Sequence, residues 1–229
     1  MPRYFLGVDV GGTFTDFVLL DQKGQVSVHK LLTTSRDPSR AVLGGIAELD
    51  TGPEITVVHG ATVATNALLE RRGARTALIT TEGFGDVLEI GRQTRRELYA
   101  LHPTRAEPLV PTSRRFELPE RIDRHGTVLV ALDPQAVDAA VRRLFADGIE
   151  SVAVCFLFSF LNPTHEQMVR KQIDACGRHA PLHISLSHEI LPEYREYERT
   201  STTVINAYVA PLMSHYLENL ERDLGGRRL

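Results

Sequence analysis

The chain has 229 residues, of which 42% are hydrophobic and 24% are charged, and its formal net charge is -3. This composition is ordinary for a globular protein, and the length allows a core that needs no disulfides. The weak negative charge argues against a nucleic-acid-binding protein, and the longest apolar run, residues 152–158, is far shorter than the roughly 20 residues of a membrane span. The N-terminus also lacks the apolar core of a signal peptide, so we expect a cytoplasmic location.

Only two cysteines occur, Cys155 and Cys176. In that compartment we expect both to be reduced and to serve packing. They do not have CxxC spacing, which disfavours a structural zinc site.

The first thirty residues predict a β-meander of strands at 4–10, 15–21 and 26–32. A helix should follow, because Ser35 or Asp37 can cap it and Pro38 suits its first turn. A short strand at 55–58, a helix at 62–72 closed by Gly73, and a buried strand at 75–80 complete this part.

Residues 83–133 hold many Arg, Glu and Pro side chains, and they predict an insertion of irregular loops with a hairpin around His125 and Gly126. An α/β pattern then resumes. We expect a helix from Asp133 to Gly148, a central strand at 152–158, a helix ending near Cys176 and a strand at 183–186. Residues 193–224 should be mostly helical, with a kink or interruption at Pro211.

This order of elements predicts an α/β fold, with a mixed sheet flanked by helices. It is compatible with a ribonuclease-H-like core that carries an insertion at about 83–133. We expect residues 1–200 to form this domain, and residues 201–229 to begin the following domain or a linker helix.

The most informative segment is the glycine turn, residues 7–16, which reads GVDVGGTFTD. Gly11 and Gly12 allow a positive φ and a close approach to a ligand, and the main-chain N–H groups of such a turn can bind an anion. Thr13 and Thr15 add hydroxyl donors. Asp9 and Asp16 flank the turn, and Asp9, at the end of a buried strand, can face a magnesium ion or its waters.

A plain hairpin is the alternative interpretation of two glycines between apolar strands. The four polar groups gathered at this turn weaken it. Other phosphate and catalytic motifs are absent, because Thr13 and Phe14 stand where a P-loop needs Lys and Ser/Thr, and no GxGxxG, GxSxG or HExxH pattern occurs.

Residues 9–16 resemble the first phosphate motif of the sugar kinase, heat-shock protein and actin superfamily, whose members bind ATP between two ribonuclease-H-like domains. Three later segments resemble markers of the hydantoinase/oxoprolinase family: residues 59–73 (HGATVATNALLERRG), 83–93 (GFGDVLEIGRQ) and 187–200 (SHEILPEYREYERT), followed by Asn206 and Tyr208. The resemblance covers nearly the whole chain, in order, and it implies one half of an actin-like ATPase fold.

The resemblance implies that ATP phosphates are held by Gly11, Gly12, Thr13 and Thr15, with Asp16 beside them. It implies that Asp9 serves Mg²⁺, and that the polar groups of Thr62, Thr65 and Asn66 face the cleft near the transferred phosphate. We count Asp9, Thr62 and Asn66 as the candidate catalytic residues.

Each of these later roles has a structural alternative. Thr62 is a reasonable N-cap of an ordinary helix, and His59 at a strand end is more simply a satisfied core histidine. Arg92 and Arg95 are candidates for contacting a phosphate or a substrate carboxylate, and are equally compatible with a solvated surface. The polar cluster at residues 189–198 fits a hinge or a subunit contact better than catalysis.

The implied activity is transfer of a phosphoryl group from ATP to the oxygen of an amide, lactam or ketone, which makes that oxygen a leaving group and leads to ring-opening hydrolysis. A kinase of the same superfamily acting on a small molecule, and a non-catalytic nucleotide-binding or assembly module, are the alternatives. Members of this type are much longer, and the second phosphate motif and the adenosine motif are not found here. We therefore expect a fragment with little ATPase activity by itself, whose partners are a second ATP-binding domain and a hydantoinase B-type subunit or half.

Overall fold

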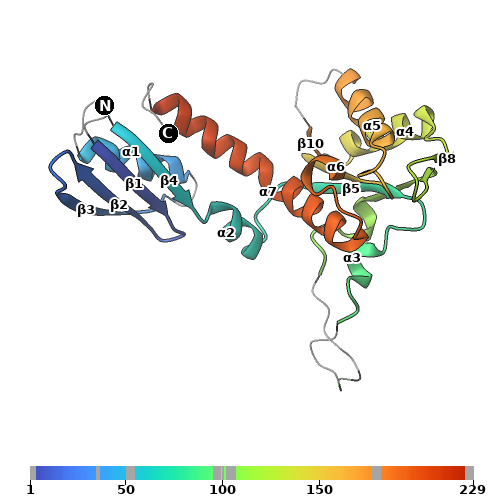
Figure 1. Ribbon diagram of the computed structural model, residues 1–229, viewed down its shortest axis with the longest axis horizontal. Helices are drawn as coiled ribbons and strands as arrows, with labels where there is room; N and C mark the ends of the chain where they lie inside the picture. Colours follow the sequence, from blue (N-terminus) through green and yellow to red (C-terminus); the bar gives the residue numbers. More distant parts are fainter. Residues whose placement is uncertain are drawn as a thin grey trace. The chain divides into compact units, whose positions relative to one another are not determined.

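The computed structural model describes residues 4–34, 37–49, 55–94, 99, 101, 107–176 and 182–224. The chain forms two compact units (Figure 1). Unit 1 consists of Met1–Arg72 and Leu212–Leu229, and unit 2 consists of Gly73–Pro211. No helix among the described residues is long and apolar enough to span a membrane.

Unit 1 is built on a four-stranded sheet with the order β3-β2-β1-β4. Strands β1 (Tyr4–Val10), β2 (Phe14–Asp21) and β3 (Val26–Leu32) form an antiparallel meander, and β4 (Ile55–Ala61) pairs in parallel with β1. Helix α1 (Pro38–Glu48) connects β3 to β4, and the short helix α2 (Val63–Leu69) follows β4. The last helix of the chain, α7 (Glu196–Asp223), contributes its C-terminal part to this unit.

Local chemistry explains these boundaries. The Asp21 carboxylate accepts the main-chain N–H groups of Lys23 and Gln25, both at 2.8 Å, and Gly24 takes a φ of +77°, which closes the β2–β3 turn. Asp37 caps α1 by accepting the Ser39 N–H group at 3.2 Å, and Pro38 occupies the first turn.

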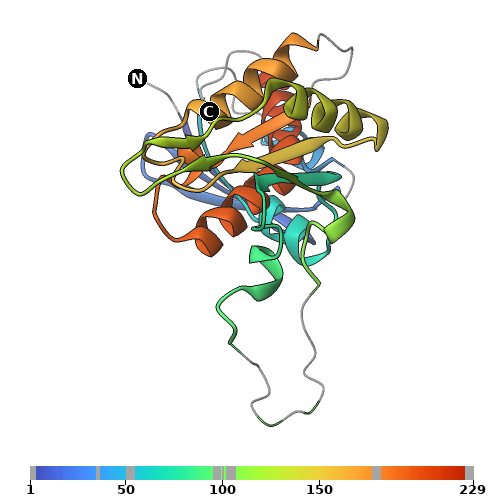
Figure 2. The same cartoon turned by 90° about the vertical axis from the view of Figure 1, so that its right-hand side faces the viewer.

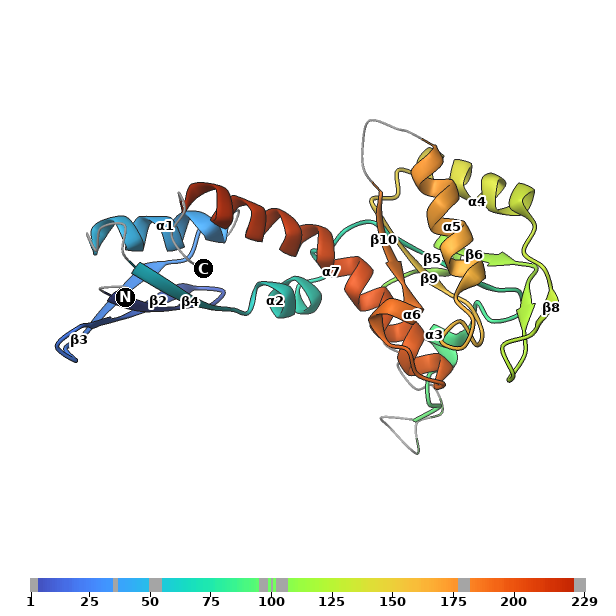
Figure 3. The same cartoon turned by 45° about the horizontal axis from the view of Figure 1, so that its top comes forward.

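The core of unit 1 lies on one face of its sheet. Leu6, Val8 and Phe17 point from the strands toward α1 and α7, which supply the remaining buried side chains, among them Val42, Ile46, Tyr216, Leu220 and Leu224. Figure 3 shows both helices on the same side of this sheet. The face that they cover is called the inner face.

Unit 2 contains a four-stranded, wholly parallel sheet with the order β10-β9-β5-β6. Its strands are β5 (Thr76–Thr81), β6 (Arg115–Leu118), β9 (Ser151–Cys155) and β10 (His183–Leu186). Strands β7 (Arg121–Ile122) and β8 (Val128–Val130) form a separate hairpin. The helices are α3 (Val87–Ile90), a 3-10 turn (Thr112–Arg114), α4 (Pro134–Ala146), α5 (Thr164–Ala175), α6 (Ser187–Ile190) and the first part of α7.

Both faces of the sheet in unit 2 are covered, as a parallel sheet requires. Helices α4 and α5 pack on one face through a large cluster that includes Val141, Leu144 and Val169. Val204 and Ala207 of α7 pack on the other face, against Leu78, Ala153 and Cys155. Figure 2, which brings unit 2 to the front, shows this arrangement of helices around the sheet.

The structure confirms an α/β fold and changes its organisation. The sequence predicts one mixed sheet, whereas the strands are divided among two four-stranded sheets and the two-stranded β7–β8 hairpin. The segment predicted as an irregular insertion supplies β6, which pairs with β5, and it also contains the predicted hairpin, where Gly126 takes a φ of +80°. Helix α7 continues through Pro211, where the sequence predicts a kink or an interruption, and Pro211 is the last residue of unit 2.

Candidate functional site: the glycine turn of unit 1

The glycine turn connects β1 to β2 through a tight hairpin. The Gly11 N–H group donates to the Phe14 carbonyl at 2.9 Å, so Gly12 and Thr13 form the tip. Neither glycine has a positive φ, which corrects the expectation drawn from the sequence. A close approach of neighbouring atoms is the reason for glycine, because a Cβ on Gly11 would lie 3.0 Å from the Phe14 carbonyl oxygen and one on Gly12 would lie 3.0 Å from Asn66 Nδ2.

The tip of the turn presents free hydrogen-bond donors. Gly12 and Thr13 are exposed, and within the described residues their main-chain N–H groups have no hydrogen-bond partner. The Thr13 carbonyl accepts the Thr33 N–H group at 2.9 Å, which fixes the turn to the end of β3. Two adjacent free N–H groups on an anchored turn are suited to an anion.

Thr15 lies on the inner face of the sheet. It is fully buried, and its hydroxyl is 3.0 Å from that of Thr33, which in turn donates to the Gly11 carbonyl at 2.9 Å. The Thr15 side chain therefore supports the turn from behind and does not reach the free N–H groups at its tip.

Asp9 and Asp16 stand directly opposite each other in the β1–β2 register, on the face of the sheet that turns away from the core. Asp16 is paired with Lys30 on β3, with 2.9 Å between Oδ1 and Nζ. No hydrogen bond or ion pair engages the Asp9 carboxylate within the described part of the chain, and its neighbour on β4 is Gly60, which leaves it open. Opposed carboxylates destabilise a sheet, so a cation beside Asp9 would relieve their repulsion.

Asp9 suits a magnesium ion better than a metal held by protein alone. Among the described residues no group of three or more His, Cys, Asp or Glu side chains is arranged to hold a metal ion. Magnesium commonly binds through one or two carboxylates together with substrate phosphates. One open carboxylate on the strand that leads into the turn with the free N–H donors fits that pattern.

Thr62 and Asn66 are brought to the turn by the start of α2. The Thr62 N–H group and hydroxyl both donate to the Val10 carbonyl, at 3.0 and 3.2 Å, so α2 begins beside the end of β1. Asn66 Nδ2 donates to Thr62 Oγ1 at 3.3 Å and lies next to Gly12. Thr62 therefore holds Asn66 at the tip of the turn, and its side chain makes no capping bond to the helix.

His59 is a half-buried residue of β4, and its Nε2 is 2.5 Å from the hydroxyl of Tyr216 on α7. Burial lowers the pKa of His59, and the nearby Asp9 carboxylate offsets only part of this effect. Burial also raises the pKa of Tyr216. This contact fastens α7 to β4, which agrees with a structural role for His59. No local sequence pattern predicts Tyr216 as its partner.

Of the two arginines proposed as substrate contacts, Arg92 is the one that the structure describes. Arg92 lies in unit 2, where its guanidinium is paired with the Glu198 carboxylate, and Arg95 lies outside the described residues. Glu189 is held by both guanidinium nitrogens of Arg170, at 2.5 and 2.7 Å, and this pairing lowers the pKa of Glu189. Glu189 and Glu198 are therefore each paired with an arginine from outside residues 189–198.

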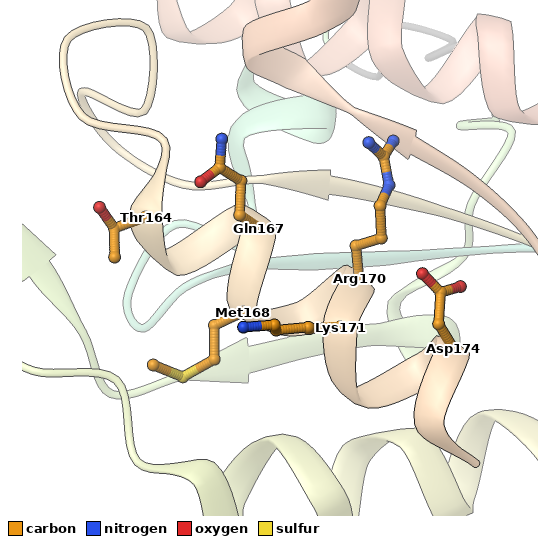
Figure 4. A pocket seen from close by; sticks show the side chains of 6 residues that line it. All are labelled: Thr164, Gln167, Met168, Arg170, Lys171 and Asp174. Carbon is orange, nitrogen blue, oxygen red and sulfur yellow. The ribbon is translucent and has the colours of Figure 1, made fainter.

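Unit 2 also carries a surface hollow of about 430 Å³ along α5. Figure 4 shows its six lining side chains, all from one helix: Thr164, Gln167, Met168, Arg170, Lys171 and Asp174. It includes none of the predicted site residues, and its Arg170 already pairs with Glu189. The hollow is a surface groove beside a helix and carries no functional assignment.

A buried polar network follows the strands of unit 2. The fully buried Glu166 carboxylate accepts the Phe156 N–H group at 3.1 Å, the Ser187 hydroxyl at 2.6 Å and the His188 N–H group at 3.1 Å, and its Oε2 lies 2.6 Å from His188 Nδ1. Every bond leads to another part of the same unit, so the network fixes α5, α6 and the end of β9.

The fold and the site define an α/β protein with an exposed glycine turn at the end of its first strand. Residues 5–177 match the hydantoinase/oxoprolinase N-terminal region, and the chain belongs to this family.

Similar sequences span much longer proteins. The chain is 40% identical to an uncharacterized protein of Methanocaldococcus jannaschii, over 94% of this chain and 32% of that protein. It is 36% identical to caprolactamase subunit alpha of Pseudomonas jessenii, over 99% of this chain and 34% of the subunit, and 30% identical to 5-oxoprolinase of Dictyostelium discoideum, over 94% and 20%. The chain thus spans about a third or less of the length of these relatives.

Solved structures agree with this placement. The ATP-dependent caprolactamase of P. jessenii superposes with a TM-score of 0.85 at 35% identity, covering 96% of this chain and 34% of that one. Acetone carboxylase in its nucleotide-free form, from work on ATP-dependent acetone carboxylation, gives 0.84 at 25% identity, covering 99% and 35%. Both structures are described in connection with ATP-dependent reactions.

Proposed function

We propose that this chain supplies the phosphate-binding turn of an ATP-dependent enzyme that activates an amide, lactam or ketone carbonyl, with ring-opening hydrolysis of a cyclic amide as the favoured outcome. The observation that carries the proposal is the pair of free N–H groups at Gly12 and Thr13, beside the open carboxylate of Asp9. The relatives named as caprolactamase and 5-oxoprolinase support the cyclic amide as substrate class.

In this proposal each residue of the turn has a separate task. The N–H groups of Gly12 and Thr13 bind phosphate oxygens, and Asn66 donates its amide from the start of α2. Asp9 holds the magnesium ion that accompanies the phosphates, with Asp16 behind it on β2. Thr15 and Thr62 position the turn and Asn66 through the bonds described above.

ATP supplies a phosphoryl group that converts a poorly reactive carbonyl oxygen into a leaving group. The residues of the chain contribute positioning and charge stabilisation to such a transfer, which is where most of the catalysis of phosphoryl transfer arises. We assign the rest of the activity to two other parts. One is polypeptide equivalent to the part of the relatives' sequence that lies outside the matched region, and the other is a hydantoinase B-type partner. The isolated chain is therefore expected to turn over little or no ATP.

Binding can be tested separately from turnover. In amide-resolved NMR spectra, millimolar MgATP should shift the main-chain signals of Gly12 and Thr13 and the side-chain amide of Asn66. Asp9→Asn should weaken the magnesium dependence of these shifts. Gly12→Ala should reduce them, because its new Cβ would crowd Asn66 Nδ2 at 3.0 Å, while Gly44→Ala, a matched glycine replacement in α1, should leave them unchanged.

The alternatives give different results. Unchanged spectra at millimolar MgATP would refute the phosphate-binding turn and favour an assembly module. A kinase would be favoured if the complete enzyme released a stable phosphorylated compound instead of free phosphate with a ring-opened acid.

A further inference from the structure

The sheet of unit 1 has an outer face, opposite the inner face, that is apolar over most of its area. The pairing of the four strands places its side chains in rows across the sheet. Two adjacent rows bring together six large apolar residues, all of them exposed: Phe5, Val18, Leu20, Val26, Val28 and Val58. These six residues are called the apolar patch. Val28 is 78% exposed, and Val26 and Val58 are each 64% exposed.

The next row toward the glycine turn is charged. It contains Asp9, Asp16 and Lys30, with Gly60 on β4 beside Asp9. The apolar patch is therefore continuous with the proposed phosphate site, on the same face of the same sheet. A polypeptide that covered the patch would also come next to Asp9 and Gly60.

A sheet with this face exposed to water is incomplete. Helices α1 and α7 cover the inner face, and within the described residues no helix lies on the outer one (Figure 3). Strands β1 and β4 pair in parallel, and parallel strands are normally buried on both faces. Contiguous apolar patches of more than a few hundred Å² mark interaction surfaces.

The edge of the sheet supports the same conclusion. The strand order ends with β4, so one edge of β4 has no neighbouring strand among the described residues. Ile55 and Val57 on this strand are buried in the core, whereas Val58 points outward. An unpaired edge strand with an apolar outer side chain is a place where further polypeptide can add.

We propose that the apolar patch is a docking surface. Its occupant is polypeptide equivalent to the two thirds of the relatives' length that this chain does not match. The caprolactamase and acetone carboxylase structures contain this fold over nearly the whole of the present chain, yet it makes up only 34% and 35% of theirs. The remaining polypeptide can therefore cover the patch. The part that does so should present an apolar face, such as the apolar stripe of a helix that packs on a sheet.

The test is a binding experiment without nucleotide, so it is independent of the proposed function. The probes are the parts of caprolactamase subunit alpha and of the M. jannaschii relative that lie outside the matched region, each produced as a separate polypeptide. The intact 229-residue chain should form a one-to-one complex with at least one of them, measured by light scattering after gel filtration and by calorimetry.

Val28→Glu combined with Val58→Glu should weaken this complex by at least about tenfold, because two charges would be buried at the contact. Leu129→Glu is the matched control, since Leu129 is 61% exposed on β8 of unit 2 and lies outside the patch. The double variant Val28→Thr and Val58→Thr keeps the β-branched shape and should give an intermediate loss if the glutamate variant folds poorly.

Three results would overturn the proposal: no complex with either probe, equal weakening by Leu129→Glu, or a homodimer of the chain that the patch variants dissociate. The last result would assign the patch to a second copy of this chain.

Discussion

Gly45 of α1 provides the sharpest test of how unit 1 is packed. A Cβ at this position would lie 2.1 Å from Cζ of Phe17, and 2.5 and 2.6 Å from two further ring carbons. Carbon atoms pack at about 3.5–4.0 Å, so the ring would have to move by more than an ångström. Phe17 is fully buried beneath α1, so the ring has no space into which it can move.

The expected effect of Gly45→Ala follows from two opposed contributions. Overpacking of a full core costs about 3 kcal/mol at the upper end of its usual range, and exchange of glycine for alanine within a helix returns about 1 kcal/mol. We therefore expect a net destabilisation of unit 1 by about 2 kcal/mol. For a unit of this size that lowers the melting temperature by about 10 °C.

Gly44 is the matched control one residue away. A Cβ there would meet only Leu31 Cδ1 at 3.9 Å, an ordinary contact, so Gly44→Ala should stabilise α1 by about 0.5–1 kcal/mol. The chain lacks tryptophan, so unfolding is followed by circular dichroism in urea and on heating. Phe17→Leu should restore part of the stability lost in Gly45→Ala. Equal melting temperatures for the two alanine variants would refute the close contact.

Three further predictions concern single side chains. Because the pKa of His59 is lowered in the folded state, the unfolded chain binds more protons than the folded chain as the pH falls below about 6.5, and the free energy of unfolding should decrease. His59→Gln should weaken this pH dependence, measured by urea unfolding at several pH values. Glu166→Gln should destabilise unit 2 by about 2–3 kcal/mol, measured by urea unfolding, since the buried carboxylate serves three donors besides the His188 ring. A thiol reagent should label the exposed Cys176 of the native protein at once. It should label Cys155 only on unfolding, because burial raises the pKa of that thiol.

Local signals in the sequence recovered most of the secondary structure. The predicted strands at 4–10, 26–32 and 183–186 have the observed bounds, because alternation and turn residues mark both ends. Asp133 caps α4 as expected, with its carboxylate accepting the Gln135 N–H group at 2.9 Å. The expected helix at 62–72 is shorter, and ends at Leu69.

The division into separate sheets depends on strand pairings that no local sequence pattern specifies. Strand β6 has only four residues and lies in a charged segment, and its place next to β5 is set by tertiary contacts. The contact of His59 with Tyr216 likewise joins residues 157 positions apart. Arg92 shows the same limit, since its partner Glu198 comes from a distant part of the chain.

The candidate site was predicted in part. The sequence indicated the turn and its neighbours Thr62 and Asn66, which the structure brings together. The positive φ expected for Gly11 and Gly12 is wrong, because the presence of glycine does not by itself distinguish a positive φ from a close approach of neighbouring atoms. The burial of Thr15 could have been read from the alternation of β2, where Thr15 and Phe17 share one face and Asp16 takes the other.

Unit 1 is assembled from two stretches of chain that are separated by the whole of unit 2. Its core needs Tyr216, Leu220 and Leu224, which are synthesised long after the strands that they cover. During translation the meander therefore emerges with its inner face only partly covered, while unit 2 already has every strand and helix of its own. Prior folding of unit 2 would shorten the effective loop that must close before α7 returns to the first sheet. A released chain that ends at Pro211 should accordingly have a protease-resistant second unit and a protease-sensitive first one.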